Sequence, residues 1–166
     1  MHGDSKSEVT ALLDRLVAEA LPNQSGLEAW ASLLRAHATL MRRLEADLAA
    51  ATGLALADFD VLAQLAQAGG ELRMAELADR ALISRSGMTR RVTRLVDEGL
   101  VRRANTDSDR RGVVVTLSDA GVARLAETAP VHLRAVAEMF VAQLDEQELA
   151  LLKSALDKVV ADCTFG

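Results

Sequence analysis

Four arginines occur in one short stretch of this chain that contains no acidic residue. They lie within residues 84–94 and are Arg85, Arg90, Arg91 and Arg94. A guanidinium group holds several N–H donors in one plane, which suits phosphate oxygens and the edge of guanine. Several such groups along one helix would bind an extended polyanion better than a small substrate. The stretch therefore indicates contact with nucleic acid.

The periodicity of residues 84–99 predicts a helix with two different faces. One face is apolar and holds Met88, Val92, Leu95 and Val96. The opposite face holds Ser86, Gly87, Arg90, Thr93 and Arg94. If the apolar face is anchored in a core, the other can enter a major groove. Arg90 and Arg94 are then the candidates for base contacts, and Ser84, Arg85, Ser86 and Thr89 near the helix start are candidates for phosphate contacts. The alternative is an ordinary solvated helix face.

A polar turn carries two further arginines after this helix. Residues 100–105 and 111–117 read as two strands joined by the polar turn 106–110, so that Asp109, Arg110 and Arg111 lie at the tip of the hairpin. An arginine at the tip of such a hairpin can reach the minor groove, and Asp109 can orient Arg111 by a charge-assisted hydrogen bond. A plain solvated turn is the other interpretation.

Two short helices are expected before the arginine helix. Residues 59–66 form the first, which ends at Gly69 and Gly70, and residues 74–81 form the second. Ser84 is the expected N-cap of the arginine helix and Gly99 ends it. The order helix, turn, helix, hairpin predicts a winged helix-turn-helix unit.

Longer helices flank this unit on both sides. We expect them at residues 7–21, at 27–52, from the cap Ser118 towards 143, and after a capping box formed by Asp145 and Glu148. Apolar residues recur in the second at intervals of three and four, in a heptad pattern: Leu27, Trp30, Leu34, His37, Met41, Leu44 and Leu48. Such a pattern favours packing against a second helix, so we expect a homodimer.

Composition and charge distribution further limit the classes of function that the chain can have. The formal charge is −5, yet residues 71–124 hold eleven Arg against eight Asp and Glu, so the basic residues are concentrated in this segment. The three histidines and the single cysteine, Cys163, lie far apart and match neither a catalytic set nor a metal-ligand spacing. We expect no enzymatic activity, no metal and no cofactor. No apolar run of about 18 residues or secretion signal is apparent, so we expect a cytoplasmic protein without membrane contact.

The chain resembles the MarR (multiple antibiotic resistance regulator) family of winged-helix transcription factors. The resemblance rests on Asp109, Arg111, Gly112, Val115, Leu117 and Ser118, which look like the family's wing signature, and on residues 84–101, which look like its recognition helix and first wing strand. It covers about residues 27–160. It implies a mainly α protein with a small β-wing, a dimer bound to a palindromic operator of double-stranded DNA, and repression relieved by a small ligand.

This resemblance also implies an organisation of the chain. It predicts one domain over residues 1–166, in which residues 7–52 and 119–161 form a helical dimerisation region. Residues 55–118 form the winged-helix lobe that binds DNA.

The extra helix at residues 7–21 resembles the urate-responsive subgroup of the family, as do Asp60, Arg91 and Arg103. The subgroup has a tryptophan in its first helix, whereas Trp30 of this chain lies in the second. The resemblance implies an anionic effector held by Arg91 and coupled through Arg103 to the DNA-binding lobe. In the alternative interpretation Arg91 contacts phosphate and Asp60 forms a structural ion pair. Trp30 and His37 can line an effector pocket or serve as core and interface residues.

A winged helix used only for protein contacts is the alternative function. Its basic face would meet an acidic partner protein, and the chain would lack specific affinity for DNA. A protein that neutralises several phosphates must bind DNA with a steep salt dependence, and this property separates the two hypotheses.

Overall fold

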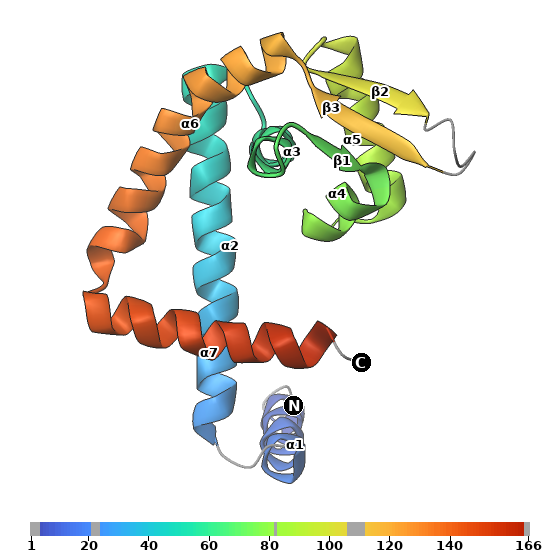
Figure 1. The fold of residues 1–166 in the computed structure, drawn as a ribbon. Coiled ribbons are helices and arrows are strands. Elements are labelled where there is room, and N and C mark those ends of the chain that lie inside the picture. The colour runs from blue at the N-terminus through green and yellow to red at the C-terminus, as the bar shows by residue number, and fades with distance from the viewer. Residues whose placement is uncertain (1–3, 21–23, 82, 106–111, 165–166) are drawn as a thin grey trace. The chain divides into compact units, whose positions relative to one another are not determined.

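The computed structural model describes residues 4–20, 24–81, 83–105 and 112–164 (Figure 1). Its elements in chain order are α1 (Asp4–Ala20), α2 (Gln24–Thr52), α3 (Leu56–Gln67), β1 (Glu71–Arg73), α4 (Met74–Arg80), α5 (Arg85–Asp97), β2 (Val101–Asn105), β3 (Val113–Leu117), α6 (Asp119–Met139), the short 3₁₀ helix η1 (Val141–Gln143) and α7 (Glu146–Thr164). The predicted class, mainly α with a small β-wing, is confirmed.

By their internal contacts the residues form two compact units, Met1–Arg42 and Arg43–Gly166. The first contains α1 and most of α2. The second contains the end of α2 and all later elements, including the winged helix. The predicted single domain with a dimerisation region over 7–52 and 119–161 stays a prediction. Among the described residues no single helix is long and apolar enough to cross a membrane, and only α2 and α3 taken together across their bend reach that length and hydropathy.

The wing is part of a three-stranded antiparallel sheet in the order β1-β3-β2. In β3, Val115 lies opposite both Leu72 of β1 and Arg103 of β2. The sequence predicted only the hairpin formed by β2 and β3. It missed β1 because a strand of three residues has too few positions to show alternation, and its place depends on pairing with a strand more than forty residues later.

The core of the second unit lies among α3, α4, α5 and the sheet. Its fully buried side chains include Val61, Leu62 and Leu65 of α3, Leu77 of α4, Met88, Val92 and Leu95 of α5, and Val115 of β3, and Leu48 at the end of α2 packs against them. The apolar face predicted for the arginine helix is therefore anchored as expected. Val96 is the exception, because it remains 38% exposed.

Glycines end α3 and α5 at the predicted positions. Gly99 has φ 73°, its N–H donates to the carbonyl of Val96 at 2.9 Å, and the N–H of Leu100 donates to that of Leu95 at 2.9 Å. This is the Schellman arrangement, in which a residue with positive φ lets the last carbonyls of a helix find donors. It turns the chain directly from α5 into β2.

Serine caps begin α5 and α6, as predicted. The Ser84 Oγ accepts from the N–H of Gly87, and the Ser118 Oγ accepts from that of Gly121 at 3.0 Å. Ser118 also donates to the carbonyl of Gly99 at 2.7 Å, which joins the start of α6 to the end of α5.

The predicted capping box at the start of α7 is also present. The Asp145 N–H donates to Glu148 Oε2 at 2.9 Å, and the Glu148 N–H donates to Asp145 Oδ1 at 2.8 Å. The preceding helix, expected to continue towards 143, ends at Met139 and is followed by η1.

Candidate nucleic-acid interface

The start of α5 combines unpaired backbone donors with positive side chains. The first turn of the helix contains no acid. Ser84 satisfies the N–H of Gly87 at 3.2 Å, and the positive end of the helix dipole points the same way as the remaining N–H groups. Arg85 and Ser86 are exposed beside it. This end of α5 is suited to bind an anion such as a phosphate group.

A hollow of about 420 Å³ lies on the exposed side of α5. Its lining residues are Ile83, Ser84, Gly87, Arg90, Arg91 and Arg94. Three arginines from the middle and the last turn of α5 thus line one hollow together with Ser84, the N-cap of the helix. Arg90 and Arg94, which were predicted to share the DNA-binding face, both line this hollow, and so does Arg91, which was predicted to hold an effector. The contacts of Arg90 and Arg94 with DNA stay a prediction.

The two candidates for base contacts have different surroundings. Arg90 is exposed. Arg94 forms an ion pair with Asp58 Oδ2, and its Nε lies 4.0 Å from Glu98 Oε1, while half of its side chain remains accessible. Arg90 can therefore rearrange freely on meeting a ligand, whereas Arg94 is held in one orientation.

Hydroxyl groups on the same helix are partly engaged with its backbone. Thr89 Oγ1 donates to the carbonyl of Arg85 at 2.9 Å, and Thr93 Oγ1 donates to that of Thr89 at 2.9 Å. A phosphate oxygen can only accept, so Thr89 must give up this bond before it can donate to phosphate. Ser84 and Ser86 lie with their Oγ atoms 3.3 Å apart. The hydroxyls best placed for phosphate contact are thus the two serines.

The predicted residues at the wing tip, Asp109, Arg110 and Arg111, lie outside the described residues. The strands that lead to the tip are described, and β2 presents Arg102 and Arg103 as exposed side chains. Arg102 is paired with Thr116 in the sheet, and Arg103 with Val115. The wing therefore adds exposed positive charge to the same unit as α5.

The structure brings together some of the predicted effector residues. Burial raises the pKa of the Asp60 carboxyl, although a hydrogen bond with Gln64 and the positive charges of His132 and Arg91 act in the opposite direction. The His132 ring lies 4.6 Å from that of Phe59, and burial lowers the pKa of His132. Asp60, Arg91 and His132 thus form one electrostatic cluster. His132 was not among the predicted effector residues.

Other predicted effector residues are placed separately. Arg103 lies on β2, and Trp30 and His37 lie on the part of α2 that belongs to the first unit, where both are exposed. Arg91 points its Nη1 at Asp58 Oδ1, 2.9 Å away, rather than forming its closest ion pair with Asp60. The effector assignment of all five residues stays a prediction.

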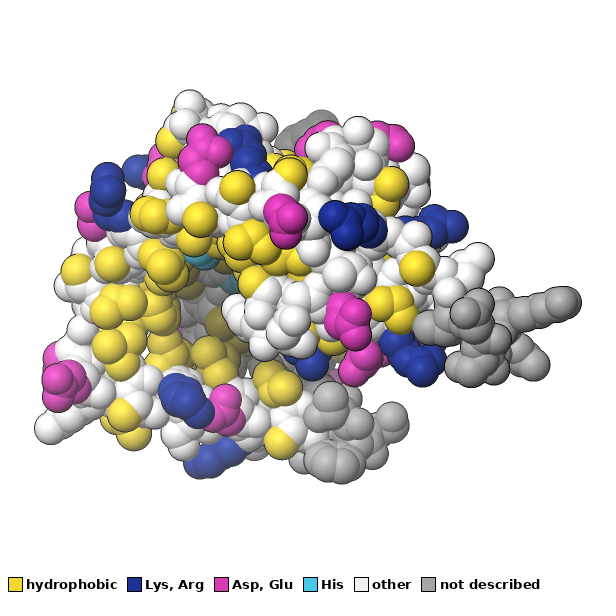
Figure 2. Space-filling model, turned by 45° about the horizontal axis from the view of Figure 1, so that its top comes forward, with side chains coloured by type: hydrophobic (Ala, Val, Ile, Leu, Met, Phe, Trp, Pro, Cys, Tyr) yellow, Lys and Arg dark blue, Asp and Glu magenta, His cyan; other side chains and the backbone are white. Residues whose placement is uncertain are grey.

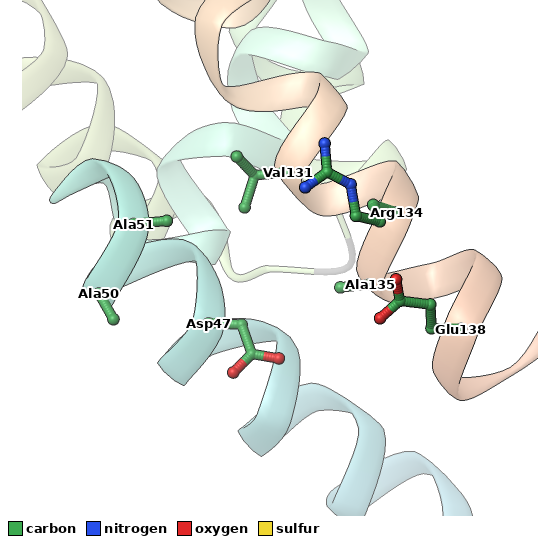
Figure 3. Close-up of a pocket in the computed structure, with 7 residues that line it drawn as sticks. All are labelled: Asp47, Ala50, Ala51, Val131, Arg134, Ala135 and Glu138. Carbon is green, nitrogen blue, oxygen red and sulfur yellow. The ribbon is translucent and has the colours of Figure 1, made fainter.

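A second cavity of about 420 Å³ lies between the end of α2 and the middle of α6. It is lined by Asp47, Ala50, Ala51, Val131, Arg134, Ala135 and Glu138. In Figure 3 the carboxylates of Asp47 and Glu138 point into this space from the two facing helices. Among the described residues, no group of three or more His, Cys, Asp or Glu side chains is arranged to hold a metal ion.

Sequence reasoning missed Asp58, the residue that holds two arginines of α5. A signal for it exists in the sequence. Asp58 precedes Val61, Leu62 and Leu65 by three, four and seven residues, so it occupies the apolar stripe of α3. An acid on such a stripe becomes buried when the helix packs, and a buried charge requires a partner. The pattern could have predicted a buried ion pair, but not the identity of the cations.

Comparison with known proteins gives the same family from sequence and from structure. The model of the MarR family matches residues 52–112. A helix-turn-helix transcriptional regulator of Bacillus cereus is 31% identical over 106 residues, which are 64% of this chain and 69% of the relative.

Solved structures that resemble this chain belong to the same family. AbsC, a MarR family transcriptional regulator from Streptomyces coelicolor, is 30% identical with a TM-score of 0.80, over 88% of this chain and 99% of AbsC. Another MarR family regulator of that organism, solved in complex with DNA, is 31% identical with a TM-score of 0.78, over 84% of this chain and 89% of the other. All three relatives are transcriptional regulators and not enzymes. The chain therefore belongs to the MarR family of transcriptional regulators.

Proposed function

We propose that this protein is a homodimeric repressor that binds a palindromic operator through α5 of each protomer and is released by a small anionic ligand. The observation that carries the proposal is the face of α5. Three arginines from the middle and last turn of α5 line one hollow with the N-cap Ser84, while Met88, Val92 and Leu95 fix the opposite face in the core. A rigid, positively charged helix face of this kind can enter a major groove.

Exposed apolar side chains on the outer helices support the proposed dimer. In α1 they include Leu12 and Leu16, in α6 Leu133 at 63% exposure, and in α7 Leu151 at 72%. Figure 2 shows hydrophobic side chains exposed over a continuous part of the surface on the side where α6 lies. Apolar area of this extent favours burial against another protein surface. A second copy of the same chain would also cover the exposed heptad residues Trp30, Leu34 and Met41 of α2. Leu44 and Leu48 of the same pattern are already buried within the chain.

A two-fold dimer determines the form of the operator. Two copies of α5 related by such an axis would read the same base pairs in opposite directions, so the site would be a palindrome with half-sites about one helical turn apart. Repression follows if that site overlaps a promoter.

The proposed ligand would act through Arg91. Asp60, Arg91, Arg103, Trp30 and His37 are the candidate residues for binding it. An anion on Arg91 would compete with Asp58, whose Oδ1 lies 2.9 Å from Arg91 Nη1. Because Arg91 is part of α5, a change of partner there would disturb the helix that contacts DNA.

The test begins with selection of a duplex from a random pool by the purified protein. Affinity for the selected duplex and for a random duplex of equal length is then measured by fluorescence anisotropy across a salt series, and the mass of the free protein by light scattering. We expect a dimer and selective binding that weakens steeply with salt. Weak binding without preference would contradict the proposal and favour an acidic protein partner.

Two variants locate the binding surface. Arg90→Ala should weaken binding to the selected duplex by about 1–3 kcal/mol, and repeated selection should show a relaxed base preference at one position of each half-site. Arg134→Ala removes an exposed arginine of α6 instead and should leave both properties unchanged. Equal effects of the two substitutions would exclude α5 as the reading helix.

A further inference from the structure

Asp58 is a buried carboxylate at the start of α3 that faces the arginine helix. It is only 3% exposed and lies in the first turn of α3, among the buried side chains of the core. The positive end of the α3 dipole favours an anion at this place. A carboxylate buried to this degree is tolerated only when its oxygens are paired.

Both oxygens of Asp58 are paired, and with two different arginines of α5. Oδ1 accepts from Nη1 of Arg91 at 2.9 Å, and Oδ2 accepts from Nη2 of Arg94. The two arginines are three residues apart, so they stand one above the other on the same side of α5. One carboxylate therefore restrains both guanidinium groups and joins α3 to the exposed face of α5.

The two restrained arginines differ in access to solvent. The side chain of Arg91 is 25% exposed and that of Arg94 is 51% exposed. A guanidinium has five N–H donors, and Asp58 engages only part of those of Arg94. Arg94 is thus held by a buried carboxylate, with the exposed Glu98 4.0 Å from its Nε, and half of its side chain stays accessible to a ligand.

This arrangement has two opposing effects on DNA binding. The carboxylate neutralises positive charge next to the binding face, and this weakens attraction to any phosphate backbone. It also fixes the plane of a guanidinium, and a fixed plane favours the base that matches the positions of its donors over bases that do not.

We propose that Asp58 is a positioning residue that determines specificity, by orienting Arg94 for base recognition at the expense of general DNA affinity. The inference rests on the proposed function, because it assumes that α5 contacts DNA. Asp58 itself is buried and does not touch the nucleic acid.

The test compares Asp58→Asn with the parent on the selected duplex and on a random duplex of equal length, across a salt series. Asn keeps the shape and removes the charge. We expect tighter binding to random DNA with a salt slope steeper by about 0.9 for the cation released to phosphate. We expect the ratio of specific to random affinity to fall about tenfold, within the range for one lost bidentate base contact.

A control separates the loss of charge from the loss of orientation. Asp97→Asn removes the same charge from an exposed position of α5, the helix that carries Arg94. It should leave the affinity ratio at the parent value. In an Arg94→Ala background, Asp58→Asn should produce no further loss of discrimination, because the residue through which it acts is gone. Thermal unfolding shows which variants are folded.

If Asp58→Asn does not fold, Asp58→Glu is used in its place. It keeps the charge and therefore the salt slope, but it displaces the bound guanidinium by one methylene and should still reduce discrimination. A folded Asp58 variant that keeps the parent's affinity ratio would contradict the inference. So would Asp58→Asn if it reduced discrimination equally in the parent and in the Arg94→Ala protein. Neither result would contradict the proposed function. If the parent protein selects no duplex, both the proposed function and this inference are wrong.

Discussion

Replacing Gly121 with alanine should destabilise the protein, although alanine is the better helix former. Gly121 lies in the first turn of α6, and its N–H donates to the Ser118 cap. A Cβ built there would lie 2.1 Å from the carbonyl oxygen of Leu100 and 2.8 Å from Cδ1 of Leu117. The Leu117 side chain can move aside. The Leu100 carbonyl is backbone and also accepts from the Ser118 N–H at 3.1 Å, so it cannot move without breaking that bond.

The expected magnitude follows from two opposing contributions. Replacing Gly with Ala inside a helix raises the free energy of unfolding by at most about 1 kcal/mol. Overpacking against a rigid neighbour costs about 3 kcal/mol when a contact is this short. The free energy of unfolding should therefore fall by about 2 kcal/mol, and for a domain of this size the midpoint of thermal unfolding should fall by about 4–8 °C.

Gly87 supplies a matched control within the same unit. It also donates its N–H to a serine cap three residues earlier, at the start of α5. A Cβ at Gly87 would lie 3.1 Å from Ser84 Oγ and 3.4 Å from Ile83 Cγ2, both of which are side-chain atoms that can shift. Gly87→Ala should change stability by less than about 1 kcal/mol.

The prediction is tested by urea denaturation of both variants, followed by circular dichroism at one protein concentration. The concentration must be equal because association would contribute to stability. A Gly121→Ala protein as stable as the Gly87→Ala protein would show that the start of α6 does not lie against the Leu100 carbonyl.

Two further predictions concern the core and the titrating cluster. Met88→Ala should lower the free energy of unfolding by about 2–5 kcal/mol, because Met88 is fully buried beneath the binding face; a loss below 1 kcal/mol in urea denaturation would contradict that placement. Burial lowers the pKa of His132 below its ordinary 6.5, so the folded state binds fewer protons than the unfolded chain in the window directly below pH 6.5. Stability should therefore be lost as pH falls through that window, and His132→Gln should flatten the curve, as measured by urea midpoints at a series of pH values. Asp60, whose pKa is raised, contributes the opposite sign just above pH 3.8. An unchanged curve directly below pH 6.5 in the variant would exclude His132 as the titrating group.

The sequence predicted the local features of this protein correctly because each is encoded within a few residues. The apolar stripe of α5, the serine caps of α5 and α6, the capping box before α7 and the terminal Gly99 all involve positions no more than about one helical turn apart. The resemblance to the family rests on the same segments together with the wing signature, which are also local in sequence.

Contacts between distant segments were decided only by the tertiary structure. Strand β1 exists because Leu72 meets Val115 in β3. Gly121 is required because the chain passes the Leu100 carbonyl at the start of α6. Neither neighbour can be identified from the sequence around the residue itself.

The partners of Asp58 show the difference most clearly. An acid on the apolar stripe of α3 indicates a buried charge, but Arg91 and Arg94 lie 33 and 36 residues further along the chain. Periodicity specifies which face of each helix is buried, whereas the rotation and depth at which two helices pack specify which side chains meet. The sequence by itself thus determined that α5 carries a basic face, and only the tertiary structure, which brings Asp58 of α3 to Arg94, decided that Arg94 is held while Arg90 is exposed.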